Sequence, residues 1–93
     1  MKYKYPALII KDDDGFFVEF PDLEDTFTGG NTLNEALENA EDVLNLMLWD
    51  REEEGIPIPE ASSMDEIEIR ENATAALIRA DKIEYRKKVL VRK

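Results

Sequence analysis

The chain of 93 residues contains neither cysteine nor histidine. Without cysteine, the protein can form neither a disulfide nor a thiolate metal site. Without histidine, it lacks the commonest general base and the commonest transition-metal ligand. No catalytic motif takes their place. The sequence therefore predicts a protein that is not an enzyme and that carries no metal ion and no cofactor.

Long apolar runs are also missing. No run approaches the roughly 18 to 20 residues that span a bilayer, and the N-terminus lacks the pattern of a signal peptide. We therefore expect a cytoplasmic protein without a membrane partner. The length suits one domain with a small core, whose stability is expected to be marginal or assisted by self-association.

Positive charge is scarce over most of the chain. The sequence carries 12 Lys and Arg against 22 Asp and Glu, a formal net charge of −10. Residues 1–60 hold four basic and 16 acidic side chains, whereas residues 82–93 hold six basic side chains and only Glu84. Nucleic acids are bound largely through cations that neutralise phosphate. The acidic body is therefore expected to meet a basic partner instead.

The beginning of the chain predicts a β-hairpin. Residues 2–11 form the first expected strand, with a second half that is apolar on both faces. Pro6 lacks an N–H group, which indicates an edge position or a bulge in this strand. Asp12-Asp13-Asp14-Gly15 is typical of a hairpin turn. Residues 16–20 alternate as a half-buried antiparallel strand does.

A third strand and a helix are expected to follow. Residues 25–30 predict a short strand with Phe27 facing inward between two threonines, and the short connections favour meander order. Thr32 and Glu35 fit a capping box at a helix N-terminus. The apolar residues that follow recur every three or four positions for about six turns. Gly55 is expected to end this helix.

The rest of the chain completes an α+β fold of order β-β-β-α-β-α. Residues 60–72 are polar and predict only a short strand or turn, whereas residues 73–80 predict a fourth strand. A short helix is expected over residues 81–85. We therefore expect a domain over residues 1–80, followed by a short helix and a basic linker or tail over residues 81–93.

Several short motifs follow one another along the chain, namely Tyr5-Pro6-Ala7-Leu8, Phe20-Pro21-Asp22-Leu23, Gly29-Gly30, Thr32-Leu33-Asn34-Glu35 and Gly55-Ile56-Pro57-Ile58-Pro59. Their order resembles the N-terminal domain of the HicB antitoxin family, which has a partial, degenerate ribonuclease H-like fold. The resemblance covers residues 3–60, with a weaker match at residues 76–85. Glu24-Asp25 stands where the family usually has Pro-Gly, so the resemblance does not define the conformation of that loop.

The resemblance implies an antitoxin of a type II toxin–antitoxin system that neutralises a HicA-like toxin, a small basic protein that cleaves mRNA. An acidic surface complements such a partner. Many family members continue into a domain that binds operator DNA. This chain stops about where that domain begins, so operator DNA is expected as a partner only if such a domain exists. A homo-oligomer, dimer or tetramer, is expected as well.

Charge and expected exposure, rather than a family motif, select the candidate partner-binding residues. One group lies on the loop after the second strand, and the other lies at the end of the helix. The candidates are Asp22, Glu24, Asp25, Glu52, Glu53 and Glu54.

Two alternatives remain at this point. The first is a fragment of an oligomeric transcriptional regulator, joined through the sheet edge or through the Trp49 side of the helix. The second is a degenerate Mg²⁺-dependent ribonuclease H-like hydrolase that uses Asp12, Asp14 and Asp22. Residues 5–10 contain no acidic residue, although such nucleases place one carboxylate in the first strand.

Overall fold

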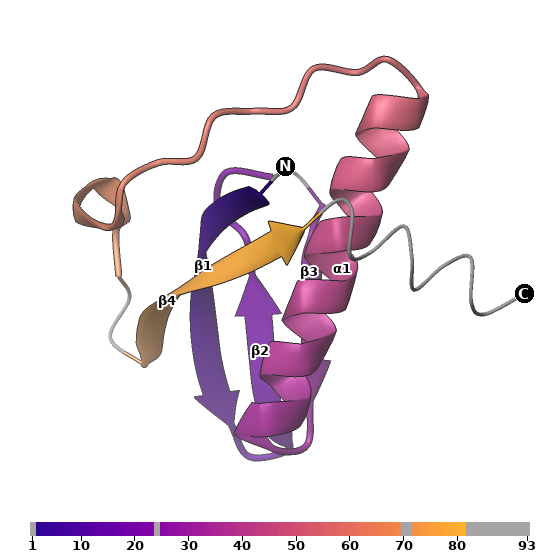
Figure 1. The fold of residues 1–93 in the computed structure, drawn as a ribbon. Coiled ribbons are helices and arrows are strands. Elements are labelled where there is room, and N and C mark those ends of the chain that lie inside the picture. The colour runs from indigo at the N-terminus through magenta and orange to yellow at the C-terminus, as the bar shows by residue number, and fades with distance from the viewer. Residues whose placement is uncertain (1, 24, 70–71, 82–93) are drawn as a thin grey trace, which may run out of the picture.

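One long helix packs on one face of a four-stranded antiparallel sheet in the computed structural model, which describes residues 2–23, 25–69 and 72–81 (Figure 1). The elements are β1 (Lys2–Asp12), β2 (Gly15–Glu19), β3 (Phe27–Gly30), α1 (Leu33–Glu53), the 3₁₀ helix η1 (Met64–Glu66) and β4 (Ala73–Asp81). The sheet order β3-β2-β1-β4 confirms the predicted meander and the fourth strand. The α+β class is therefore confirmed. The short helix expected at residues 81–85 extends outside the described residues.

β1 is a central strand in the sheet order, yet the predicted edge position of Pro6 is confirmed, because only one neighbouring strand pairs with β1 at this residue. β1 pairs without interruption with β4 from Lys2 to Ile10, but it pairs with β2 only from Leu8 to Asp12. Pro6 therefore lies in the half of β1 that β2 does not flank.

The direction of the backbone groups explains why proline fits there. Asp12 and Gly15 close a two-residue turn, so this pair must exchange its hydrogen bonds directly. Even-numbered residues of β1 therefore direct their N–H and C=O groups towards β2, and odd-numbered residues direct theirs towards β4. Pro6 is even-numbered and lies beyond the end of β2. Its missing N–H group costs the sheet no hydrogen bond.

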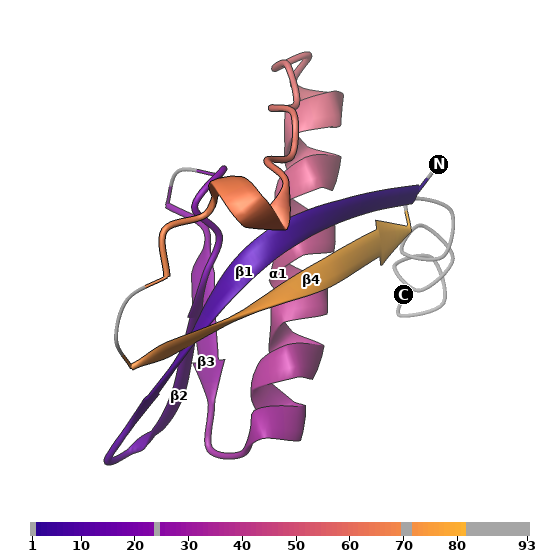
Figure 2. The same ribbon diagram turned by 90° about the vertical axis from the view of Figure 1, so that its left-hand side faces the viewer.

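The core lies between α1 and one face of the sheet, as Figure 2 shows with α1 behind β1 and β4. Four buried residues of α1 follow the predicted helical spacing, namely Ala36, Ala40, Leu44 and Leu48. They belong to one core cluster with Phe20, just after β2, and with buried side chains of the sheet, among them Tyr5, Ala7, Ile9, Val18 and Ile78. The two alanines keep the N-terminal half of α1 thin, which lets the helix lie close to the sheet.

The predicted inward orientation of Phe27 is wrong. Its side chain is 57% exposed, whereas the neighbouring Thr26 is only 2% exposed. Phe27 lies on the face turned away from α1, where its ring is 5.8 Å from the ring of Phe17. In β3, Gly30 faces α1 and Phe27 faces away from it, the reverse of the prediction. The physical reason lies at Gly30, where a Cβ atom would lie 2.6 Å from the backbone nitrogen of Ala36. Position 30, on the α1 side of β3, therefore has no room for a side chain.

The predicted Thr32 cap of α1 is confirmed, whereas Glu35 accepts from the Asn31 N–H instead of the Thr32 N–H that a capping box uses. The Thr32 hydroxyl accepts a hydrogen bond from the Glu35 N–H at 3.1 Å, and the Glu35 carboxylate accepts one from the Asn31 N–H at 3.0 Å. We expect Thr32→Ala to lower the free energy of unfolding by about 1 kcal/mol, because it leaves a helix amide without this acceptor. Urea unfolding measures the change. Asn34→Ala, an exposed change in the same turn, is the matched control, and an equal loss in both variants would contradict this role.

Candidate partner-binding surface

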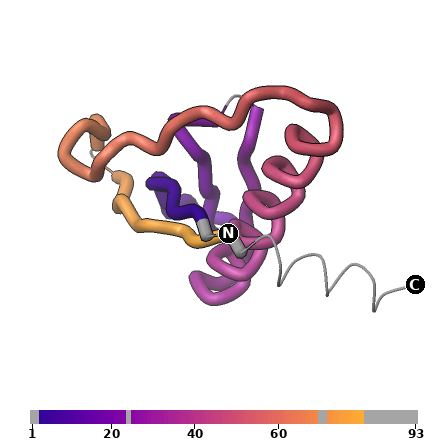
Figure 3. Tube along the Cα trace, turned by 45° about the horizontal axis from the view of Figure 1, so that its top comes forward, coloured from indigo at the N-terminus to yellow at the C-terminus, as the bar shows by residue number. Residues whose placement is uncertain are grey.

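The connecting segment, residues 54–69, crosses the end of the molecule where both β2 and α1 end (Figure 3). Gly55 starts this crossing with a left-handed backbone, at φ 72°. Its N–H group donates to the Glu52 carbonyl at 3.2 Å, and the Ile56 N–H donates to the Arg51 carbonyl at 2.7 Å. This pair of bonds is a Schellman motif, which ends a helix and reverses the chain. The predicted stop at Gly55 is confirmed.

Two tyrosines of β1 hold the connecting segment and the end of the helix. The Tyr5 hydroxyl donates a hydrogen bond to the Pro59 carbonyl, and the Tyr3 hydroxyl donates one to the Glu52 carboxylate at 3.3 Å. Burial is the main cause that raises the pKa of Tyr5 above its usual value, with smaller contributions from Tyr3 and Asp22. The Tyr5 hydroxyl therefore stays protonated, as the bond to Pro59 requires.

Asp22 binds the connecting segment to the loop after β2. Its carboxylate accepts two hydrogen bonds from Ser62, one from the backbone N–H at 2.7 Å and one from the hydroxyl at 2.6 Å. Charge-assisted bonds of this kind are stronger than neutral ones. The structure thus places this candidate residue, half-buried, at a contact within the protein, where it positions the surface around it.

We expect Ser62→Ala to lower the free energy of unfolding by about 1 to 2 kcal/mol, because the Asp22 carboxylate loses one of two short hydrogen bonds. Hydrogen exchange of amides in residues 56–69 should accelerate as well. Ser63→Ala is the matched control, because the hydroxyl of Ser63 binds only the exposed Glu66. Equal stability of the two variants would show that the Asp22–Ser62 contact does not hold the connecting segment.

The other candidate residues differ in exposure. Asp25 is exposed on the loop, where it adopts a left-handed backbone with φ 56°. Glu24 lies outside the described residues. Glu52 is half-buried and accepts the Tyr3 hydroxyl, whereas Glu53 and Glu54 are exposed at the end of α1.

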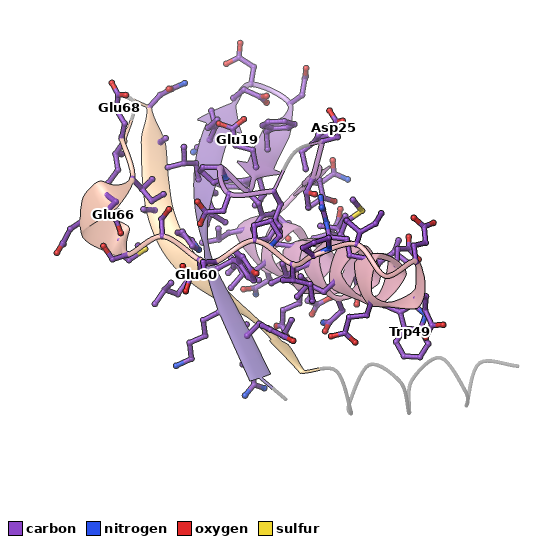
Figure 4. The ribbon with its side chains drawn as sticks, turned by 90° about the horizontal axis from the view of Figure 1, so that it is seen from above. Glu19, Asp25, Trp49, Glu60, Glu66 and Glu68 are labelled. Carbon is purple, nitrogen blue, oxygen red and sulfur yellow. The ribbon has the colours of Figure 1, made fainter. Side chains whose placement is uncertain are left out.

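Sequence reasoning missed the carboxylates of the connecting segment. Glu60, Asp65 and Glu66 are exposed, and Figure 4 shows Glu60 along the connecting segment and Glu66 on η1, apart from Asp25 on the loop after β2. We call the exposed carboxylates of the loop after β2, the end of α1 and the connecting segment the acidic end, comprising Asp25, Glu53, Glu54, Glu60, Asp65 and Glu66. A signal was present in the sequence, since residues 50–69 hold eight carboxylates against the single cation of Arg51.

Glu66 is ordered by a local cap. Its carboxylate accepts hydrogen bonds from the Ser63 N–H at 2.9 Å and from the Ser63 hydroxyl at 3.0 Å. These bonds, the backbone one first, hold the pKa of Glu66 below its usual value. The carboxylate therefore stays ionised at neutral pH and keeps a defined position on the acidic end.

The carboxylates of the hydrolase alternative do not meet. Asp12 and Asp14 lie on the turn before β2, where Asp12 accepts the Asp14 N–H at 2.8 Å. Asp22 follows the other end of β2 and is engaged by Ser62. A five-residue strand separates the two groups by roughly 17 Å, which is too far for shared coordination of a metal pair.

Among the described residues, no helix is both long enough and apolar enough to cross a bilayer.

Trp49, which one alternative placed at a subunit contact, is half-buried on α1 and projects away from Asp25 (Figure 4). The neighbouring Leu46 is 44% exposed.

Comparison with known proteins identifies the family. The profile described as HicB-like antitoxin of bacterial toxin-antitoxin system matches residues 5–90. Antitoxin HicB 2 of Photorhabdus laumondii is 33% identical over 79 residues, which are 81% of this chain and 55% of that protein. The chain spans about half the length of the curated relatives it matches.

Solved structures agree with this result. A toxin–antitoxin complex from Streptococcus pneumoniae contains a chain that superposes with a TM-score of 0.83 at 25% identity, over 91% of this chain and 73% of that one. A HicA3 and HicB3 toxin–antitoxin complex contains a chain with a TM-score of 0.69 at 27% identity, over 85% of this chain and 99% of that one.

Proposed function

Because the chain belongs to the HicB-like antitoxin family of bacterial toxin–antitoxin systems, we propose that it neutralises a basic, HicA-like toxin by covering the toxin's RNA-facing surface. Two of the similar structures are toxin–antitoxin complexes, one of them of HicA3 with HicB3. A toxin that cleaves mRNA must attract phosphate with cations. An acidic antitoxin competes for the same cations, without chemistry of its own.

The acidic end is our proposed contact surface, and the exposure of its carboxylates on the loop after β2, at the end of α1 and on the connecting segment is the observation that carries the proposal. Asp25, the carboxylates at the end of α1 and those of the connecting segment come from three separate parts of the sequence. Asp22 and Glu52 support this surface through their contacts with Ser62 and Tyr3. Glu24 belongs to the same loop and completes the set predicted from the sequence.

The division of the chain follows from the same proposal. Residues 1–80 form the toxin-binding domain, and residues 81–93 form a short helix and a basic linker or tail. Operator DNA is a partner only where a DNA-binding domain follows this linker in the full protein. We propose that the protein acts in the cytoplasm, where a toxin that cleaves mRNA acts, and that it forms a homo-oligomer.

Binding to the toxin tests the function. The chain and the small basic protein encoded beside its gene are purified together, and complex formation is followed by gel filtration at 50 mM and at 500 mM salt. The expected result is a stable complex that weakens with salt, because screening reduces attraction between charged surfaces. The complex should also suppress RNA cleavage by the toxin. A folded chain that forms no complex and leaves cleavage unchanged would overturn the proposal.

A further inference from the structure

β4 leaves a long free edge on the sheet (Figure 2). The odd-numbered residues of β1 bond to β4, and Ala7 pairs with Ala76, so the even-numbered residues of β4 exchange hydrogen bonds with β1. The odd-numbered residues of β4 therefore direct their backbone N–H and C=O groups out of the sheet. These residues are Ala73, Ala75, Leu77, Arg79 and Asp81.

The two edges of the sheet differ. β3 is only four residues long, and the outward carbonyl of its Gly29 accepts a hydrogen bond from the Asn39 side chain of α1 at 2.8 Å. β4 is nine residues long, contains no proline, and its outward groups bond to no other residue in the described ranges. Free backbone groups on such an edge bind an additional strand.

We propose that this edge binds the β4 strand of a second copy of the chain in antiparallel orientation, with Leu77 at the two-fold axis. This proposal specifies the self-association proposed above and does not require the toxin. With Leu77 at the axis, all nine residues of β4 lie opposite residues of the second copy. The outward N–H and C=O groups of each strand then face the outward C=O and N–H groups of the other. Leu77 then faces the partner's Leu77, and Arg79 faces the partner's Ala75. No like charges lie directly opposite each other in this register.

Charge selects a second copy as the occupant. The chain has a net charge of −10, so two copies repel each other over most of their surfaces. β4 carries one cation, Arg79, and one carboxylate, Asp81 at its last position, so this edge is close to neutral and is a place where two copies can approach. A basic toxin finds only Asp81 on this strand to attract it.

Apolar area adds to the backbone hydrogen bonds. Leu77 is 52% exposed in the single chain, and pairing across the axis buries it against its own copy. An open groove of about 360 Å³ runs beside the edge and is lined by Lys4, Leu37, Glu41, Leu77, Ile78 and Arg79. Side chains of the added strand that face α1 have room in this groove.

The test is sedimentation velocity of the full chain without toxin, from 1 to 200 μM, together with hydrogen exchange measured residue by residue. The proposal expects a dimer and protected amides at Ala75, Leu77 and Arg79, although β1 does not bond these groups. Leu77→Lys places two ammonium groups opposite each other and should raise the dimer dissociation constant at least about tenfold. Leu46→Lys changes a leucine of comparable exposure on α1 and should leave this constant unchanged.

Three results would overturn the proposal: a monomer at 200 μM, a dimer that Leu77→Lys does not weaken, or free exchange of the three amides in the dimer. Protection that arises only when the basic toxin is added would assign the edge to the toxin. Toxin binding by Leu77→Lys is measured separately, so a loss of the dimer is distinguished from a loss of the antitoxin function.

Discussion

Gly30→Ala is expected to lower the free energy of unfolding by about 3 kcal/mol, a large part of the stability of a domain of this size. The added Cβ atom would lie 2.6 Å from the backbone nitrogen of Ala36 and 3.0 Å from its Cα atom. Backbone atoms of a helix cannot rotate away as a flexible side chain can. The collision is relieved only if β3 and the first turns of α1 separate, which opens the core around Ala36.

Gly55→Ala provides the contrasting control. Gly55 has a left-handed backbone, but a Cβ atom there would meet nothing within 4 Å. The expected loss is about 1 kcal/mol, which is the cost of a left-handed backbone for alanine. Urea unfolding of the two variants separates the cost of collision from the cost of backbone strain. If Gly30→Ala lost no more stability than Gly55→Ala, the close approach of β3 to α1 would be contradicted.

Elements defined by local chemistry were predictable from the sequence. The cap at Thr32 and the stop at Gly55 depend on residues only a few positions apart, and the structure confirms both. The orientation of Phe27 was not predictable in this way. In a four-residue strand with two glycines, alternation alone does not say which side faces the core. The contact of Gly30 with Ala36 decides it, and that contact is tertiary.

The position of the connecting segment could not be derived from periodicity, because residues 56–63 have no regular structure. Its course depends on contacts between distant residues, namely Tyr5 with Pro59 and Asp22 with Ser62. Nothing in the local sequence of Asp22 distinguishes a carboxylate that holds this segment from one that faces solvent. Glu60 and Glu66 were missed for the same reason: their position depends on the course of the connecting segment, which these contacts between distant residues determine.

Glu53 and Glu54 are placed against local stability. Negative charge at the C-terminus of a helix is unfavourable by a few tenths of a kcal/mol, because the backbone dipole presents carbonyl groups there. Both side chains are exposed. They take no part in the Asp22–Ser62 and Tyr5–Pro59 hydrogen bonds, which hold the connecting segment. The proposed contact with a basic partner accounts for this placement, and so does solubility, whereas a role in folding does not.

A double charge reversal, Glu53→Lys with Glu54→Lys, is therefore expected to weaken toxin binding about 100-fold at physiological salt, because attraction to a basic surface becomes repulsion. The salt dependence of the dissociation constant should become shallower in the same variant. Its free energy of unfolding should be unchanged or slightly higher, since lysine suits a helix C-terminus better than glutamate does. The loss of affinity then cannot be attributed to unfolding.

The matched control is Asp13→Lys with Asp14→Lys, which changes the net charge equally on the turn at the opposite end of β2. Its affinity should stay within about threefold of the unmodified chain, because exposed charges farther apart than about 8 to 10 Å are screened at physiological salt. Isothermal titration calorimetry with the toxin compares the two variants. An equal loss of toxin affinity in both variants would show that net charge, and not the position of Glu53 and Glu54, determines binding. A loss confined to the Asp13 and Asp14 variant would move the interface to the hairpin, while toxin binding as the function would stand.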